Sequence, residues 1–121
     1  MKSLTPKEKQ IMTLLWTHGP MFIREMLTFY DEPKPHYNTV STLIKILIEK
    51  GFVSYQAFGN TYRYSAKVSE KEYKGNALGE LVTQYFENSY TNVVSQFVEE
   101  EKISLDELKA LIAQIEKHNG Q

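Results

Sequence analysis

The chain contains no cysteine among its 121 residues. It can therefore form no disulfide, no thiolate metal site and no cysteine nucleophile. It also has no apolar run near the roughly 18 residues that a membrane-spanning helix requires, and its first residues lack the apolar core of a signal peptide. We therefore expect a cytoplasmic protein that folds without thiol chemistry and without membrane insertion.

Residue types that are typical of enzyme sites are few and scattered. The three histidines are His18, His36 and His118, and none stands at metal-ligand spacing from another. The acidic run 99–101 cannot converge on one helix face, so we expect a solvated loop there. Seven aromatic residues fall on predicted core faces: Phe29, Tyr30, Phe52, Tyr55, Tyr85, Phe86 and Phe97. We expect no enzyme, no metal site and no cofactor.

The charged residues are divided unevenly along the chain, although the formal net charge is only −1. Residues 1–67 carry nine Lys and Arg against five Asp and Glu, a net charge of +4. Residues 68–121 carry five against ten, a net charge of −5. Chance clustering is one explanation of this asymmetry. The other is a front half that binds a polyanion, joined to an acidic rear half that contacts something else.

Three short helices are predicted in the front half. The first begins at the capping box Thr5 to Glu8 and ends at Gly19-Pro20. The second runs from Ile23 to Tyr30 and is closed by the prolines at 33 and 35. The third, residues 38–50, separates an apolar face from a polar face at helical spacing. Its apolar face is formed by Val40, Leu43, Ile44, Leu47 and Ile48.

A β-hairpin is predicted next, because residues 52–58 and 61–65 are rich in aromatic and β-branched side chains. Gly59-Asn60 between them is typical of a two-residue hairpin turn. Three short helices followed by a hairpin are the layout of a winged helix-turn-helix domain, whose third helix enters the major groove of DNA. We therefore expect a mainly α fold with a small β-hairpin. We expect a winged helix-turn-helix DNA-binding domain at residues 1–67 and a helical dimerisation region at residues 68–121.

The rear half, residues 68–121, is predicted to be helical. A second capping box, Ser69 to Glu72, opens a long helix whose end is left open between 88 and 92. A third, Ser104 to Glu107, opens the last helix. The apolar stripe of these helices is too long for one chain to cover, so we expect a homodimer. The residues expected at its interface are Leu78, Leu81, Val82, Tyr85, Phe86, Val94, Phe97, Leu108, Leu111, Ile112 and Ile115.

The polar face of the third predicted helix carries residue types that recognise DNA. Asn38 can bind an adenine edge through two hydrogen bonds, whereas Ser41 and Thr42 can contact bases or phosphates. The helix N-terminus also favours a phosphate. The alternative is that Asn38 and Thr39 merely cap the helix, while the two hydroxyl residues after them are ordinary solvated positions.

The chain resembles the penicillinase and methicillin-resistance repressors nearly from end to end. The resemblance depends on the order and spacing of several segments rather than on a single motif. These segments are Leu4-Thr5-Pro6-Lys7-Glu8, Leu15-Trp16, Asn38-Thr39-Val40-Ser41-Thr42-Leu43, Glu49-Lys50-Gly51-Phe52-Val53, Tyr62-Arg63-Tyr64, Phe97-Val98-Glu99 and Leu105-Asp106-Glu107-Leu108.

The resemblance implies a homodimeric transcriptional repressor of resistance or stress genes, which binds inverted-repeat operators with TACA/TGTA-like half-sites. Carried over position by position, it implies that the base-reading residues are Asn38, Thr39, Ser41 and Thr42. We expect contacts to the DNA backbone from Tyr37, Lys45, Asn60 and Arg63. Similar proteins are inactivated by a membrane sensor-protease system that triggers cleavage at an Asn-Phe bond, which aligns here with Gln96-Phe97.

The chain departs from the family pattern at several positions. The best-known members carry lysine where this chain has Asn38, so we expect a different operator preference. The wing offers only Arg63 beside Asn60 and Gln56, so we expect weak phosphate contact through the hairpin. Gln96 replaces the asparagine of the cleavage site. Copper-responsive relatives carry a C-terminal cysteine cluster, and a chain without cysteine cannot sense copper in that way.

Two other functions stay open at this point. A winged helix can bind protein instead of DNA, and the net charge of this chain is not basic. A repressor of this size can also sense a small aromatic ligand, which would bind in the cleft between the two regions. A steep salt dependence of DNA binding would distinguish a DNA-binding domain from one that binds protein. Thermal stabilisation of the protein by an aromatic ligand would support the second alternative.

Overall fold

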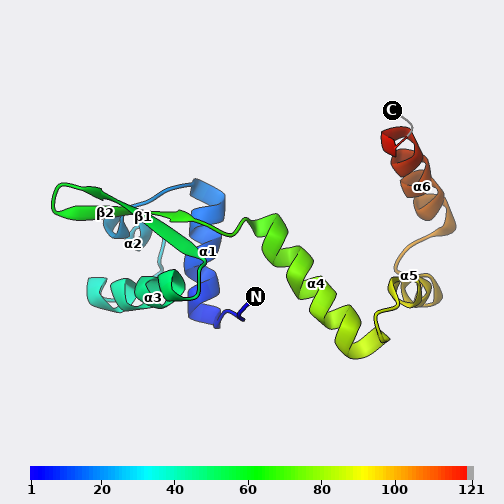
Figure 1. The fold of residues 1–121 in the computed structure, drawn as a ribbon, viewed down its shortest axis with the longest axis horizontal. Helices are drawn as coiled ribbons and strands as arrows, with labels where there is room; N and C mark the ends of the chain where they lie inside the picture. Colours follow the sequence, from blue (N-terminus) through cyan, green and yellow to red (C-terminus); the bar gives the residue numbers. More distant parts are fainter. Residues whose placement is uncertain (120–121) are drawn as a thin grey trace. The chain divides into compact units, whose positions relative to one another are not determined.

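The computed structural model describes residues 1–119 as a mainly helical chain with one two-stranded antiparallel hairpin (Figure 1). Its elements, in chain order, are α1 (Pro6–His18), α2 (Ile23–Leu27), α3 (Tyr37–Glu49), β1 (Val53–Phe58), β2 (Thr61–Ala66), α4 (Glu70–Phe86), α5 (Tyr90–Glu99) and α6 (Leu105–Asn119). This order confirms the predicted fold class, a winged helix followed by a helical region. Each helix within the described residues is too short or too polar to traverse a lipid bilayer.

All three predicted capping boxes form. At the start of α1, the Thr5 hydroxyl accepts from the Glu8 amide at 3.2 Å, and the Glu8 carboxylate accepts from the Thr5 amide at 3.0 Å. The same reciprocal pairs join Ser69 to Glu72 at α4 and Ser104 to Glu107 at α6. These bonds satisfy amide groups that have no acceptor inside the first helical turn. The starts of these helices therefore follow from local sequence.

The core of the first compact unit, residues 1–76, lies between the first three helices and the beginning of the hairpin. The apolar face predicted for α3 is the one that packs into this core, and the polar face is left in solvent. The fully buried members of the core are Ile11, Met12, Leu15, Met21, Ile23, Met26, Val40, Ile44, Leu47, Phe52 and Val53.

The hairpin closes over the predicted two-residue turn, because Phe58 pairs with Thr61 on either side of Gly59-Asn60. Gly59 has a φ of 60°, a left-handed conformation that favours glycine. Tyr64 of β2 also exchanges two backbone hydrogen bonds with Met21, at N–O distances of 2.9 and 2.8 Å. Since Met21 precedes α2, this bridge attaches the hairpin to the helical core.

The first unit includes the beginning of α4. The Trp16 indole Nε1 donates to the Val68 carbonyl oxygen at 2.9 Å, and the Trp16 ring packs against Tyr73 at a centroid distance of 5.6 Å. Tyr73 also meets Phe52 edge to face at 6.0 Å. Because these contacts tie the first turns of α4 to the core, the unit extends to residue 76, beyond the boundary at 67 that we predicted.

In the second unit, α4 ends in a turn made by its own polar side chains. Glu87 and Asn88 have left-handed φ values of 51° and 66°, and the Thr83 hydroxyl donates to Asn88 Oδ1 at 2.7 Å. Ser89 then caps α5 by accepting from the Asn92 amide at 3.1 Å. The acidic run begins in the last residue of α5 and continues in an exposed turn, as expected for solvated carboxylates.

Val82 is fully buried within its own chain, which corrects its place among the expected dimer-interface residues. A Cβ on Gly79, one turn earlier in α4, would lie 3.7 Å from the Tyr90 hydroxyl. The start of α5 therefore covers the α4 face that carries Gly79 and Val82. The other expected interface residues are half-buried or exposed: Leu78, Leu81, Tyr85, Phe86, Val94, Phe97, Leu108, Leu111, Ile112 and Ile115.

Within the single chain, four of the seven aromatic residues predicted to be core are exposed, and two of these four, Tyr85 and Phe97, are also expected dimer-interface residues. Phe52 is fully buried, and Tyr30 and Phe86 are half-buried. The exposed four are Phe29, Tyr55, Tyr85 and Phe97. Periodicity identifies the apolar face of a helix or strand, but it does not show whether another element covers that face.

Candidate nucleic-acid interface

The exposed face of α3 forms the first part of the candidate interface. Asn38, Thr42 and Lys45 are exposed, and spacings of four and three residues place them in one row along the helix. The opposite face is buried in the core of the first unit. A helix that packs one face against the core and exposes the other can enter the major groove of DNA, which is about 12 Å wide.

Asn38 and Thr42 present different chemistry to solvent. The Thr42 hydroxyl donates to the backbone carbonyl oxygen of Asn38 at 2.9 Å, so its proton is used within the helix. The lone pairs of the Thr42 hydroxyl and the Thr42 methyl group remain available to a binding partner. The Asn38 carboxamide forms no hydrogen bond with any group in residues 1–119, so it keeps the donor and acceptor that an adenine edge requires.

Thr39 and Ser41 lie on opposite flanks of this row, because successive helical residues are rotated by about 100°. Thr39 lines a groove of about 220 Å³ together with Lys7 and Gln10 of α1 and Tyr30 after α2. Ser41 is half-buried on the other flank. The four residues predicted to read bases therefore share one helix end, but they do not form one row.

The N-terminus of α3 has no side-chain cap. His36 stands at the N-cap position, and no side-chain hydrogen bond satisfies the first amides. The positive end of the helix dipole therefore lies beside Tyr37 and Asn38, both of which are exposed. This end of the helix is suited to an anion.

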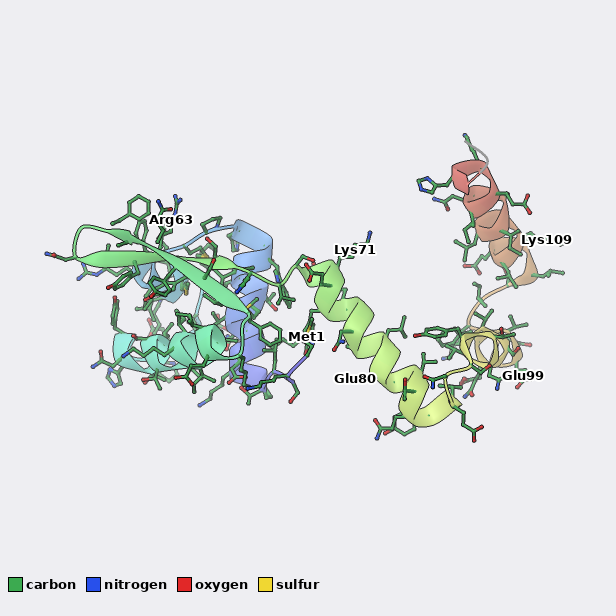
Figure 2. The ribbon with its side chains drawn as sticks, in the orientation of Figure 1. Met1, Arg63, Lys71, Glu80, Glu99 and Lys109 are labelled. Carbon is green, nitrogen blue, oxygen red and sulfur yellow. The ribbon has the colours of Figure 1, made fainter. Side chains whose placement is uncertain are left out.

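The wing carries one charged residue, Arg63, between residues 53 and 66. Arg63 pairs with Gln56, whereas Tyr55 pairs with Tyr64, and neighbouring pairs of a hairpin point to opposite faces. Figure 2 labels Arg63 on the hairpin. Its guanidinium lies over the Phe58 ring, 4.8 Å from the ring centroid. Asn60 is exposed at the tip of the turn. The side chain of Arg63 therefore extends from the hairpin face opposite to its tyrosines.

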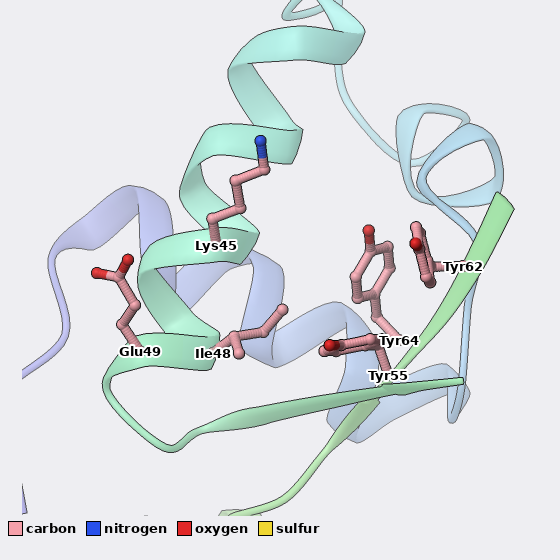
Figure 3. A pocket seen from close by; sticks show the side chains of 6 residues that line it. All are labelled: Lys45, Ile48, Glu49, Tyr55, Tyr62 and Tyr64. Carbon is pink, nitrogen blue, oxygen red and sulfur yellow. The ribbon is translucent and has the colours of Figure 1, made fainter. Parts of the chain in front are cut away.

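A groove of about 330 Å³ lies between α3 and the hairpin. Lys45 and Glu49 line it from α3, and the tyrosine cluster of Tyr55, Tyr62 and Tyr64 lines it from the hairpin (Figure 3). Sequence reasoning missed this cluster because we assigned Tyr55 to the core. The signal was available in the strand alternation, which places all three tyrosines on one face of the hairpin.

The tyrosine cluster is packed by its own rings. Tyr55 and Tyr62 meet edge to face with a centroid distance of 5.3 Å, and Tyr62 and Tyr64 are 6.4 Å apart. Burial raises the pKa of the Tyr64 phenol, and the nearby phenols of Tyr37, Tyr62 and Tyr55 raise it further. Tyr64 therefore keeps its proton in neutral solution and can donate a hydrogen bond.

The predicted cleavage bond, Gln96-Phe97, lies inside α5. The Gln96 carbonyl oxygen accepts from the Glu100 amide at 2.9 Å, and the Phe97 carbonyl oxygen accepts from the Lys102 amide at 2.8 Å. Both side chains are exposed. A protease could reach the side chains, but the backbone would have to leave its helical hydrogen bonds before cleavage.

Comparison with known proteins places these features in context. A family model described as penicillinase repressor matches residues 4–117. The penicillinase repressor of Bacillus licheniformis is 21% identical, over 98% of this chain and 93% of its own. The methicillin resistance regulatory protein MecI of Staphylococcus aureus strain N315 is 26% identical over 89% of each chain. A transcriptional regulator of Thermotoga maritima with a crystal structure is 23% identical, with a TM-score of 0.48, over 97% of this chain and 80% of that one.

Proposed function

Because the chain belongs to the penicillinase repressor family, we propose that it is a DNA-binding transcriptional repressor. It binds an inverted-repeat operator as a homodimer. The first compact unit binds the DNA, and the second holds the two protomers together. Cleavage in the second unit, triggered by a membrane sensor-protease system, releases the repressor from its operator.

The observation that carries this proposal is the exposed row of Asn38, Thr42 and Lys45 on a helix whose other face is buried. Asn38 reads a base edge, Thr42 contacts a base through its methyl group or lone pairs, and Lys45 binds a phosphate. Thr39 and Ser41 flank the row and contact bases or phosphates at its sides. Tyr37, Asn60 and Arg63 add backbone contacts around the groove.

The homodimer is supported by the apolar side chains that the second unit leaves uncovered. Leu111, Ile112 and Ile115 on α6 are 46%, 47% and 49% exposed. A standard interface buries roughly 800 Å² per subunit, which would cover such a surface. A two-fold dimer would place its two recognition helices about 34 Å apart, or a multiple of that distance, on one side of the duplex.

Footprinting of the purified protein on its own upstream region, at two salt concentrations, tests the proposal. We expect a protected inverted repeat whose protection weakens steeply with salt, because each neutralised phosphate releases a counterion. Absence of protection at low salt would contradict the repressor function and favour a winged helix that binds protein. Sedimentation of the same sample tests the dimer independently of DNA.

The proposed induction is tested on the intact protein. Cleavage between Gln96 and Phe97 should separate α6 and the whole acidic run from the rest of the chain. Engineering a specific protease site into the turn at 100–104 allows the cut to be made in vitro. We expect operator binding to fall because the dimer dissociates. If the protein cut in this turn keeps its operator affinity, separation of α6 is not the inducing event.

A further inference from the structure

We infer that the groove between α3 and the hairpin holds the sugar-phosphate backbone of one operator strand, and that the tyrosine cluster binds it through neutral hydroxyl groups. This inference extends the proposed DNA-binding function and depends on it. It assigns to Tyr55, Tyr62 and Tyr64 the role that we had expected of the wing cation Arg63.

The position of the groove favours a DNA strand as its occupant. Lys45 belongs both to the exposed row of α3 and to the lining of the groove. When α3 lies in the major groove, we expect a strand that leaves the row at Lys45 to enter the space between helix and hairpin. The groove therefore shares Lys45 with the proposed DNA-binding row of α3.

The hydroxyls of the cluster are free to bind. No hydrogen bond within residues 1–119 involves the phenol oxygen of Tyr55, Tyr62 or Tyr64, and the Lys45 ammonium is also unpaired there. Tyr55 and Tyr62 are 57% and 46% exposed. Tyrosine hydroxyls commonly donate to phosphate oxygens in DNA complexes, and the ring faces can pack against deoxyribose.

The chemistry of the lining is suited to a strand held close to the groove. Figure 3 shows the hydroxyls of Tyr62 and Tyr64 toward the same end of the groove as the Lys45 ammonium, with Tyr55 beside Ile48 toward the other end. A phosphate at the first end would meet one cation and two donors. The apolar Ile48 side and the ring of Tyr55 would face the adjoining sugar.

Glu49 lines the same groove and opposes an anion. With Lys45 and Glu49 together, the groove has no net formal charge, and Arg63 lies on the opposite face of the hairpin. Affinity from this groove must therefore come mainly from directed hydrogen bonds. Hydroxyl contacts displace no condensed counterion, whereas a lysine contact does. In a salt titration, the loss of a tyrosine hydroxyl should therefore leave the salt dependence of the affinity unchanged, whereas the loss of the Lys45 ammonium should reduce it.

The experiment uses full-length protein and two fluorescent duplexes, one from the gene's own upstream region and one with the same composition scrambled. The double variant Tyr62→Phe, Tyr64→Phe removes the two hydroxyls that would meet the phosphate and keeps both rings, so the hairpin packing is retained. Anisotropy titrations over a series of salt concentrations give the affinity and its salt slope. Lys45→Met is measured alongside, and Tyr90→Phe in α5 is the matched control.

We expect the double tyrosine variant to lose about tenfold in affinity on both duplexes, since each net hydrogen bond contributes a factor of roughly three. Its salt slope should equal that of the wild type. Lys45→Met should instead lower the slope by about one unit. Tyr90→Phe should bind like the wild type.

The outcomes distinguish this inference from the function on which it rests. Wild-type protein that binds neither duplex at low salt would overturn the repressor function itself. Wild-type binding with an unaffected double variant would overturn the groove inference alone. A loss confined to the upstream duplex would also overturn it, because a backbone contact acts on any sequence.

Discussion

Lys50 at the C-terminal end of α3 donates from Nζ to Oε1 of Glu8 in the first turn of α1, at 2.7 Å. The Glu8 side chain is only 4% exposed and that of Lys50 is 22% exposed. The same ammonium also donates to the Ser3 carbonyl oxygen at 3.0 Å. Burial would raise the pKa of Glu8, but hydrogen bonds from Lys50 and Thr5 outweigh it and hold the pKa below its ordinary value. The pair joins the C-terminal end of α3 to α1.

Removing one partner of this ion pair should destabilise the fold. Lys50→Met leaves the Glu8 carboxylate buried with fewer donors, so we expect a loss of about 2–3 kcal/mol in the free energy of unfolding. Urea denaturation followed by circular dichroism measures it. Lys9→Met, a change to an exposed lysine of α1 next to Glu8, is the control. Equal unfolding midpoints for the two variants would show that the ion pair contributes nothing.

The ion pair also predicts the direction of the acid response. The folded pKa of Glu8 lies below its ordinary value of 4.5, so folding is favoured by the ionised carboxylate. The contribution is complete above that value and is lost as pH falls through the lowered folded pKa. Urea midpoints measured between pH 6 and pH 3, as a titration series, should fall more steeply for the wild type than for Glu8→Gln. Parallel curves for the two proteins would contradict this assignment.

Asn38 should determine sequence preference. Asn38→Ala removes a side chain that can bind two positions of one base edge, so we expect a loss of about 1–3 kcal/mol per subunit on the operator. Binding to a scrambled duplex should change little. The exposed Asn76, replaced in the same way, is the control. Equal losses on operator and scrambled DNA would assign Asn38 to the DNA backbone instead.

Glu49 should weaken DNA binding through its charge. Glu49→Gln keeps the size of the side chain and removes an anion from the groove beside Lys45. We expect binding to any duplex to strengthen about two- to fivefold at low salt, with the gain shrinking as salt rises. Glu116→Gln in α6 is the control. A variant that binds more weakly would mean that Glu49 accepts a hydrogen bond from a base or from a tyrosine.

Ile112 should be needed for dimer formation and dispensable for the fold of the first unit. Ile112 is half-exposed, so a charged side chain there should change the stability of a monomer little. In an apolar interface the same charge should weaken dimer association by about 2–4 kcal/mol. Ile112→Glu should therefore sediment as a monomer while the Trp16 fluorescence stays native, since Trp16 reports the first unit. Ala110→Glu, at an exposed position on the opposite face of the same helix, is the control. Dimeric Ile112→Glu would place the interface elsewhere.

Much of the fold could be predicted because its signals are local. The capping boxes at Thr5, Ser69 and Ser104 need only neighbouring residues, and each begins a helix. The apolar periodicity of α3 identified the buried face, and Gly59-Asn60 identified the turn. The end of α4 was left open, since Glu87 and Asn88 adopt left-handed conformations that other residue types favour more strongly.

The candidate site could be predicted in part. The row of Asn38, Thr42 and Lys45 follows from helical spacing, so sequence alone places these residues together. Strand alternation places the three tyrosines on one face of the hairpin, but it does not show which element lies opposite that face. The groove forms only when the folded chain brings α3 and the hairpin together. Thr39 and Ser41 likewise share a helix end but face different neighbours.

The sequence by itself determined where helices and strands begin, which face of each is apolar, and the family to which the chain belongs. These properties depend on contacts between residues a few positions apart, and on residue order along the whole chain. Only the tertiary structure decided which apolar faces are covered: it buried Val82 and left Tyr55 in solvent. It also placed Arg63 on the hairpin face that points away from α3. Burial depends on which distant elements meet, and no local pattern contains that information.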